Sequence, residues 1–297
     1  MNYRHAYHAG NFADVFKHIV LTRAVEYLKR KGKPFRVIDT HAGTGFYDLS
    51  SDEAQKTGEW RDGIGKLVEA MVPAEALSLI APYLDIVARF NPGGGVRFYP
   101  GSPTIARELL RGQDRLTAIE LHPADFFALR SRLDGDYQTR LIELDGWLAL
   151  GAHVPPKEKR GLVLIDPPFE EPGEFDRMVD GLAKAYRRWP GGTYLFWYPI
   201  KDRKAVAGFR TALKASGIPD ILDLSIEVRR AGAGDATFDG CGMAIANPPW
   251  ALEDEMRAIL PAITGILAQG KGAAWAIERI ADERGGSEAG SAGHDPG

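Results

Sequence analysis

The chain has 297 residues, 44% of them hydrophobic, and a formal net charge of −3 at pH 7. This length and composition can bury one large core or two modest ones. The slightly acidic balance excludes binding to nucleic acid through bulk positive charge, although a local basic face is still compatible with it. The single cysteine, Cys241, cannot form an internal disulfide, so we expect a reducing, cytoplasmic environment.

The two ends of the chain carry little apolar sequence. The N-terminal residues include charged and histidine side chains and no long apolar run, which predicts neither a signal peptide nor a membrane anchor. Apolar residues at helical spacing, with Asn11 as the N-cap, predict a helix over residues 11–31. We expect a single domain over residues 1–282, a disordered tail over residues 283–297 and a monomer.

Short apolar runs follow, each ending near a polar or small residue. Most are continuous, as expected for strands that are covered on both faces, and helical patterns separate many of them. This alternation indicates a doubly wound, Rossmann-like α/β sheet. The seven expected strands are Arg36–Asp39, Leu116–Glu120, Arg140–Leu144, Gly161–Asp166, Thr193–Trp197, Ile221–Val228 and Gly242–Ala246.

The connection between the first two expected strands is too long for a simple loop. Its sequence predicts helices at Ile64–Val72, Pro82–Arg89 and Pro103–Arg111, the last two with proline in the first turn. We therefore expect a small helical insertion at about residues 50–110 that overhangs the ligand crevice.

Three weak signals stand at the ends of the first three strands, where open α/β sheets bind ligands. The first is the turn Asp39-Thr40-His41-Ala42-Gly43-Thr44-Gly45, in which Gly43 lets the backbone approach a ligand. Glu120 can accept the ribose hydroxyls of an adenosyl group, and Asp145-Gly146 is placed to meet its adenine. Each signal alone also fits an ordinary turn or a solvated strand end. A dinucleotide fingerprint and a Walker lysine are both missing, which disfavours NAD and ATP.

The fourth signal is the tetrapeptide Asp166-Pro167-Pro168-Phe169, directly after an apolar strand. An amino group on a base is a poor nucleophile because its lone pair is delocalised into the ring. The Asp166 carboxylate and the Pro167 carbonyl can each accept one amino hydrogen and so aim that lone pair at a methyl donor. The prolines make the turn rigid, and Phe169 offers a face on which an extruded base can stack. The alternative interpretation is a proline-terminated strand with an aromatic residue in the core.

Asn247-Pro248-Pro249-Trp250 matches the same pattern after the seventh strand. Asp166 follows the fourth strand, next to the glycine turn across the expected switch point, whereas the seventh strand is expected farther towards the sheet edge. We therefore predict that Asp166 is the catalytic residue. Asn247–Trp250 is interpreted as a structural turn that starts a helix over Leu252–Leu260, and a place for it beside the crevice stays open.

Taken in order, these motifs resemble the bacterial large-subunit ribosomal RNA methyltransferase J family, which makes N6-methyladenosine in 23S rRNA. The resemblance extends from about Asn2 to Ile277. It rests on Tyr3-Arg4-His5, His8-Ala9-Gly10-Asn11, Asp14, Lys17-His18, Asp39-Thr40-His41-Ala42-Gly43, Tyr99-Pro100-Gly101-Ser102-Pro103, Glu120-Leu121-His122-Pro123, Asp145-Gly146, Asp166-Pro167-Pro168, Trp197-Tyr198-Pro199 and Asn247-Pro248-Pro249-Trp250.

The resemblance implies a class I methyltransferase that uses S-adenosylmethionine, yields S-adenosylhomocysteine and modifies N6 of adenine 2030 in 23S rRNA. It implies contacts to RNA from Tyr3 and a place for Lys17 near the active site, and Arg4 and Lys17 are basic candidates for RNA contact. We expect no metal and no membrane partner. The residues expected at S-adenosylmethionine are His18, His41, Gly43, Ser102, Glu120, Asp145, Gly146 and Asp166.

Three alternatives stay open. The family's fourth motif usually ends in tyrosine where this chain has Phe169, and the same variant occurs in guanine-N2 rRNA methyltransferases. The same machinery could also act on an acceptor other than RNA, either N6 of adenine in DNA or the amide of a protein glutamine. A non-catalytic RNA-binding assembly factor with a relic fold is the third alternative, against which the Asp166 motif and Glu120 both argue.

Overall fold

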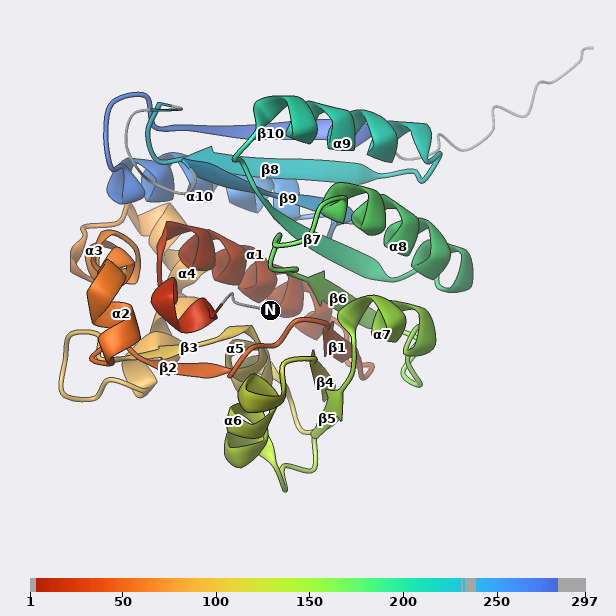
Figure 1. Cartoon of the computed structure of the whole chain (residues 1–297), viewed down its shortest axis with the longest axis horizontal. Helices are drawn as coiled ribbons and strands as arrows, with labels where there is room; N and C mark the ends of the chain where they lie inside the picture. Colours follow the sequence, from red (N-terminus) through yellow and green to blue (C-terminus); the bar gives the residue numbers. More distant parts are fainter. Residues whose placement is uncertain (1–3, 231, 233–238, 283–297) are drawn as a thin grey trace, which may run out of the picture.

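The computed structural model describes residues 4–230, 232 and 239–282, and it centres on an eight-stranded sheet with the order β10-β8-β9-β7-β6-β1-β4-β5 (Figure 1). Tyr3 and the tail expected at residues 283–297 lie outside the described residues. The strands are β1 (Arg36–Asp39), β4 (Arg115–Glu120), β5 (Thr139–Glu143), β6 (Gly161–Ile165), β7 (Thr193–Pro199), β8 (Ile221–Glu227), β9 (Gly240–Ala246) and β10 (Ala274–Ala281).

Five neighbouring strands, from β5 to β7, run parallel, so their carboxyl ends meet at one edge of the sheet. In the centre, Asp39 of β1 is paired with Leu164 of β6 and with Ala118 of β4. Strand order reverses at β1 and β6, which makes the gap between them the switch point of the sheet. The Rossmann-like fold class is therefore confirmed.

The outer part of the sheet differs from the sequence prediction in two ways. β9 lies between β7 and β8 and is antiparallel to both, so it is not the strand nearest the edge. An eighth strand, β10, pairs antiparallel with β8 and forms the edge. Most residues of β10 are exposed, so its sequence lacks the continuous apolar run by which the other strands were predicted.

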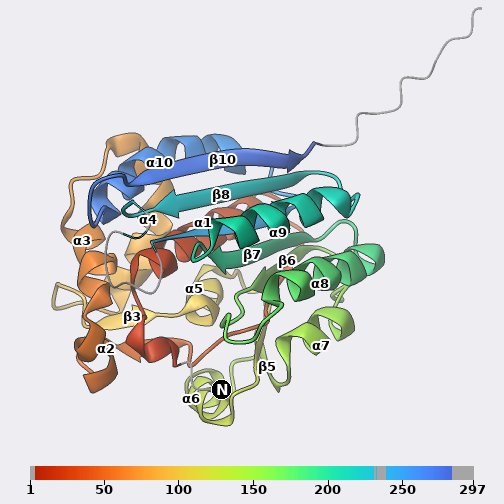
Figure 2. The ribbon, with the colours of Figure 1, turned by 45° about the horizontal axis from the view of Figure 1, so that its top comes forward.

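Helices cover both faces of the sheet and create two cores (Figures 1 and 2). One face carries α1 (Phe12–Lys29), α4 (Ala74–Arg89), α5 (Ser102–Leu109), α6 (Pro123–Leu133) and α10 (Leu252–Leu267). The other face carries α7 (Gly146–Ala152), α8 (Glu174–Arg188) and α9 (Arg203–Ala215).

The side chain of Asn11 caps α1 by accepting hydrogen bonds from the backbone N–H groups of Ala13 and Asp14, both 3.0 Å long. Nearly every residue of the first four turns is buried, polar ones included. α1 is thus a core helix and not an amphipathic surface helix, and its buried polar residues need partners inside the protein.

The chain between β1 and β4 combines helices with a small second sheet. Its elements before α5 are β2 (Phe46–Asp48), α2 (Asp52–Thr57), the 3₁₀ helix η2 (Glu59–Asp62), α3 (Ile64–Glu69), α4 and β3 (Phe98–Pro100). β2 and β3 pair antiparallel, a feature that the sequence did not indicate. α4 starts at Ala74, so Pro82 lies inside the helix and not in its first turn. α5 packs on β1, β4 and α1, and is therefore the helix that crosses over into β4.

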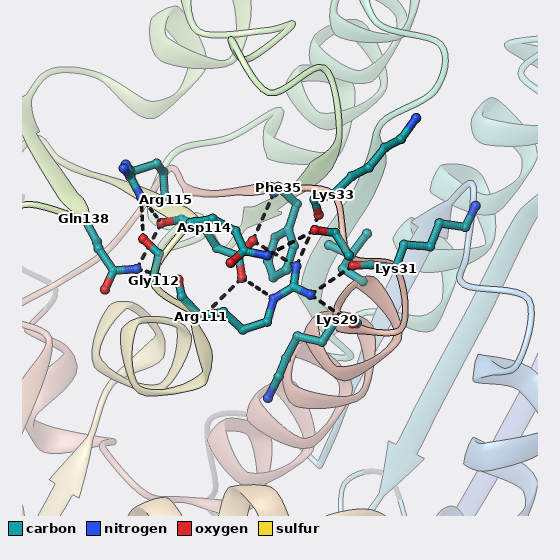
Figure 3. A network of polar contacts seen from close by, with 12 residues as sticks. Lys29, Lys31, Lys33, Phe35, Arg111, Gly112, Asp114, Arg115 and Gln138 are labelled. Atoms are coloured by element: carbon teal, nitrogen blue, oxygen red, sulfur yellow. Dashed lines mark hydrogen bonds and ion pairs between the residues drawn. The ribbon is translucent and has the colours of Figure 1, made fainter.

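At the amino edge of the sheet, Arg111 holds the loop between α1 and β1 (Figure 3). Its guanidinium donates to the carbonyls of Lys29, Lys31 and Lys33, at 3.1, 2.9 and 3.2 Å, and also to the buried carboxylate of Asp114. The carbonyls of this loop therefore point inward, and the lysine side chains point away from the network.

Within the described residues, no helix is long and apolar enough to cross a membrane.

Candidate active site

A cavity of about 620 Å³ opens at the carboxyl edge of the parallel strands. The ends of β1, β4, β5, β6 and β7 all contribute to its lining, together with α1 and the 3₁₀ helix η1 (His5–Tyr7). This is the place at which an open α/β sheet binds its ligand. The volume lies in the range of cofactor pockets.

The turn after β1 is built for close packing against β4. Gly43 has a φ of +59°, and a Cβ there would lie 2.6 Å from the hydroxyl of Tyr47. Its N–H donates to one carboxylate oxygen of Glu120 (2.8 Å), and the N–H of His122 donates to the other (2.7 Å). Burial nevertheless raises the pKa of Glu120, because desolvation outweighs these two hydrogen bonds. The two hydrogen bonds hold the Glu120 side chain at the cavity.

The start of α7 packs directly on the same turn. Asp145 caps the helix by accepting from the N–H groups of Trp147 (2.7 Å) and Leu148 (3.1 Å). A Cβ on Gly146 would lie 2.4 Å from the carbonyl oxygen of Thr40 and 2.7 Å from the His41 ring, so only glycine fits there. Asp145 and Gly146 both line the cavity.

His41 belongs to the turn after β1, and its ring lies against the start of α7. Its Nδ1 is 2.9 Å from the Thr40 hydroxyl, and its ring meets the Trp147 ring edge-on at 5.7 Å. Burial lowers the pKa of His41 to about 4, so the ring is neutral at pH 7. A neutral imidazole beside the cavity can recognise a ligand through a hydrogen bond without adding charge.

The turn Asp166–Phe169 follows β6 and faces the cavity. Pro167 is buried, and Phe169 has a φ of +51°, a conformation that few residues other than glycine adopt. The Phe169 ring meets Phe175 at 5.2 Å and Trp197 at 6.2 Å, both edge-on. The turn thus brings Asp166 to the cavity with an aromatic wall beside it.

Lys17 of α1 joins two carboxylates at the cavity. Its Nζ lies 2.5 Å from Oδ2 of Asp166 and 2.8 Å from Oδ1 of Asp14. Burial alone would lower the pKa of Lys17, but the two carboxylates outweigh it and raise that pKa well above its usual value. Asp14 is held in turn by the Gly10 N–H and by Nε2 of His5, both at 2.9 Å. Lys17 therefore remains a cation at the floor of the cavity.

Most of the site residues expected from the sequence come together around this cavity. Arg4 does not line it, and pairs instead with Glu53 at 3.7 Å. Tyr3 lies outside the described residues. Within the described ranges, no group of three metal-ligating side chains is present. The expected residues that line the cavity are Lys17, His18, His41, Gly43, Ser102, Glu120, Asp145, Gly146, Asp166, Pro167 and Phe169.

The second motif, Asn247–Trp250, lies at the opposite edge of the sheet. Ala246 at the end of β9 is paired with Tyr194 at the start of β7, because the two strands are antiparallel. The Asn247 side chain donates to the carbonyls of Pro190 (2.7 Å) and Gly192 (2.8 Å). The motif is a structural turn before α10, and a place for it beside the cavity, left open from the sequence, is excluded.

The sequence assigned no role to Asp39 and Tyr99, two polar residues behind the cavity wall that contact expected site residues. Asp39 accepts a hydrogen bond from the Ser102 hydroxyl (2.7 Å), and Nδ1 of His18 is 2.7 Å from the hydroxyl of Tyr99. Tyr99 belongs to β3 and was noticed only as part of a motif. Its signal is a tyrosine in an otherwise apolar, buried strand, which needs a polar partner for its hydroxyl.

The family model for "Ribosomal RNA large subunit methyltransferase D, RlmJ" matches residues 32–280. The chain is 42% identical over 284 residues to ribosomal RNA large subunit methyltransferase J of Haemophilus influenzae, an alignment that covers 95% of this chain and 100% of the relative. It is 43% identical over 262 residues to the protein of the same name from Escherichia coli K12, covering 88% and 92%.

Among solved structures, the chain is similar to protein LPL1258 of Legionella pneumophila. The two share 32% sequence identity and superpose with a TM-score of 0.83, covering 92% of this chain and 98% of the other. The expected family resemblance is thereby confirmed.

Proposed function

The chain belongs to the family of large-subunit ribosomal RNA methyltransferases J, and from that premise we propose that it transfers a methyl group from S-adenosylmethionine to N6 of an adenine in 23S rRNA, adenine 2030 by resemblance. The observation that carries the proposal is the Asp166–Phe169 turn, which stands at the carboxyl end of β6 beside the switch point and faces the cavity.

The residues of the cavity fit S-adenosylmethionine. Glu120 at the end of β4 is placed to accept the ribose hydroxyls, and Asp145-Gly146 at the end of β5 offers backbone groups to the adenine. His18 has an Nε2 that is buried and without a hydrogen-bond partner, which supports a missing ligand at that position. His41, Gly43 and Ser102 complete this part of the lining. The bound donor supplies an electrophilic methyl group on a sulfonium.

The turn Asp166–Phe169 holds the methyl acceptor, the amino group of the target base. Asp166 and the Pro167 carbonyl accept the two hydrogens of the target amino group, which turns its lone pair out of conjugation and towards the methyl group. Since Lys17 contacts only Oδ2 of Asp166, the second carboxylate oxygen is left for this role. The Phe169 ring stacks on the extruded base. Most of the rate gain comes from orientation. As the N–C bond forms, the methyl–sulfur bond breaks and the sulfur keeps its electron pair. The nitrogen needs no base before this step, because its hydrogens become acidic only once it is alkylated, and one of them then leaves as a proton to water.

We place the RNA over the same face. Lys17 lies at the cavity floor, and Arg4 precedes the 3₁₀ helix whose His5 lines the cavity. Together with Tyr3 they are the proposed RNA contacts of the N-terminal segment. In this arrangement Lys17 anchors Asp166 and offsets part of the negative charge of Asp14 and Asp166 next to the nucleotide that enters the site.

Asp166→Ala tests the catalytic assignment. We expect it to lower the transfer rate by at least about a hundredfold, the typical cost of losing one preorganised polar contact to the reacting group, while the affinity for the donor weakens far less. The measurements are transfer of labelled methyl to unmodified large-subunit rRNA and calorimetry of donor binding. Asn247→Ala is the matched control, since it alters the same motif at the far edge of the sheet, and it should retain transfer.

Retained turnover in Asp166→Ala would refute the assigned role. Nucleoside mass spectrometry of the labelled product then separates the alternatives. N6-methyladenosine at one site supports the proposal. N2-methylguanosine would mean that the target base is guanine, and transfer to DNA alone would mean that the substrate is DNA. A protein that binds RNA but neither binds nor turns over the donor would be an assembly factor.

A further inference from the structure

His18 and two tyrosines form a buried chain of polar groups behind the cavity. The Tyr83 hydroxyl of α4 lies 3.0 Å from the Tyr99 hydroxyl of β3, which lies 2.7 Å from Nδ1 of His18 on α1. Both tyrosines are fully buried, and His18 is 1% exposed. Only the far ring nitrogen, Nε2, has no partner, and His18 lines the cavity.

The direction of these hydrogen bonds follows from counting donors. If Tyr83 donates to Tyr99 and Tyr99 donates to Nδ1 of His18, every hydroxyl hydrogen in the chain is used. If His18 instead donates from Nδ1, one of the two buried hydroxyls keeps a hydrogen with no acceptor, whichever way the tyrosines turn. An unmade hydrogen bond in a buried site is costly, so the first direction is favoured.

From this direction we propose that Tyr99 is a positioning residue that fixes the His18 tautomer with its proton on Nε2, so that His18 donates a hydrogen bond to the carboxylate of the donor's methionine moiety. The inference rests on the proposed function for the identity of the donor. It assigns a role to the insertion between β1 and β4, because both tyrosines belong to it.

Two further observations agree with this role. Burial lowers the pKa of His18 to about 3, with Lys17 and His5 adding to the effect, so the ring is neutral and a single proton decides which nitrogen donates. Glu120 and Asp145 account for the ribose and the adenine. Of the hydrogen-bond acceptors in S-adenosylmethionine, this leaves the carboxylate for Nε2.

The test compares two ligands that differ in the group concerned. S-adenosylhomocysteine carries the amino-acid carboxylate, and 5′-methylthioadenosine lacks the amino-acid moiety. We expect Tyr99→Phe to weaken S-adenosylhomocysteine roughly fivefold, the effect of losing one neutral buried hydrogen bond, and to leave the affinity for 5′-methylthioadenosine unchanged. Calorimetry on the full chain gives both dissociation constants.

Two variants serve as controls. Tyr83→Phe leaves His18 as the only acceptor for the Tyr99 hydroxyl, so the preference between the two ligands should stay near that of the wild type. Tyr194→Phe removes an equally buried hydroxyl on β7, which donates to the carbonyl of Trp189 (2.8 Å), and should change neither affinity.

The tautomer is measured directly by ¹⁵N NMR of histidine-labelled protein without ligand, with His18 assigned from its loss in a His18→Gln variant. A proton on Nε2 in the wild type and a mixed tautomer in Tyr99→Phe support the inference. A proton on Nδ1 in the wild type overturns it, and so does an equal loss of both ligands in Tyr99→Phe. If the wild type does not bind S-adenosylhomocysteine at all, the proposed function falls as well.

Discussion

Asp39 is the acid that ends β1, and only 1% of it is exposed. Burial raises its pKa to about 7 from 3.8, although the hydrogen bond from Ser102 and the charge of Lys17 act in the opposite direction. The carboxyl group of Asp39 therefore binds its proton more tightly in the folded protein than in the unfolded chain. This carboxyl group, which lies next to the cavity, therefore makes the free energy of unfolding depend on pH.

The sign of that linkage gives a prediction. The folded form holds the proton between about pH 4 and about pH 7 and the unfolded chain does not, so stability falls as pH rises through this window and is level above it. Asp39→Asn cannot ionise and escapes this loss. Its free energy of unfolding relative to the wild type should rise by up to about 1.4 kcal/mol per pH unit across the window.

Urea denaturation at several pH values measures this difference. Other groups titrate in the same range, but they are common to both proteins and cancel in the comparison. A difference that does not change between pH 5 and pH 8 would mean that Asp39 is ionised throughout.

At the scale of elements, the loop between α1 and β1 depends on one guanidinium. Arg111 contacts the last backbone carbonyl of α1, two carbonyls of the loop and both carboxylate oxygens of Asp114, which is fully buried (Figure 3). Asp114 also accepts from the N–H of Phe35, directly before β1. The network therefore helps to set where β1 starts.

Arg111→Ala should lower the free energy of unfolding by about 3 kcal/mol, because it leaves the Asp114 carboxylate buried without its cation. Urea denaturation monitors the change. Arg130→Ala is the control. Arg130 and its partner Asp134 are both exposed, and such an ion pair contributes less than about 1 kcal/mol to the free energy of unfolding. If Arg111→Ala and Arg130→Ala were equally stable, Asp114 would have another way to satisfy its charge.

The elements themselves were predictable to the extent that burial leaves a mark on the sequence. β6 is apolar throughout and β1 is almost fully buried, and both were found with nearly the observed bounds, whereas β10 is mostly exposed and was missed. The position of β9 could not be predicted, because strand order depends on how distant segments pair. Pro82 suggested a helix start, but it lies in the middle of α4, where its missing N–H removes one backbone hydrogen bond of the helix.

The site residues that the sequence revealed are those that follow recognisable strands. Asp166, Glu120 and Asp145 follow strands that were recognised, and parallel strand ends must meet at one edge of the sheet. Tyr99 approaches His18 from the insertion, whose fold depends on contacts that no local pattern encodes. The cavity wall was thus predictable, and the groups that orient it were not.

At the scale of the whole molecule, the chain carries a net charge of −3, so attraction to RNA depends on where its cations lie. Two exposed lysines lie at opposite edges of the sheet. Lys201 follows β7 and lines the cavity, whereas Lys31 belongs to the loop before β1 (Figure 3). If the target base enters the cavity, the flanking phosphates lie near Lys201 and far from Lys31.

Lys201→Ala should therefore weaken RNA binding and lower the slope of log affinity against log salt concentration by about one phosphate contact. Lys31→Ala is matched in charge and exposure and should leave both the affinity and the slope unchanged. Fluorescence anisotropy with a fragment of large-subunit rRNA, measured from low to moderate salt, gives both quantities, and calorimetry checks that donor binding is intact. A larger loss in Lys31→Ala than in Lys201→Ala would place the RNA on the amino edge of the sheet, and the target base would then have no path from that surface to Asp166.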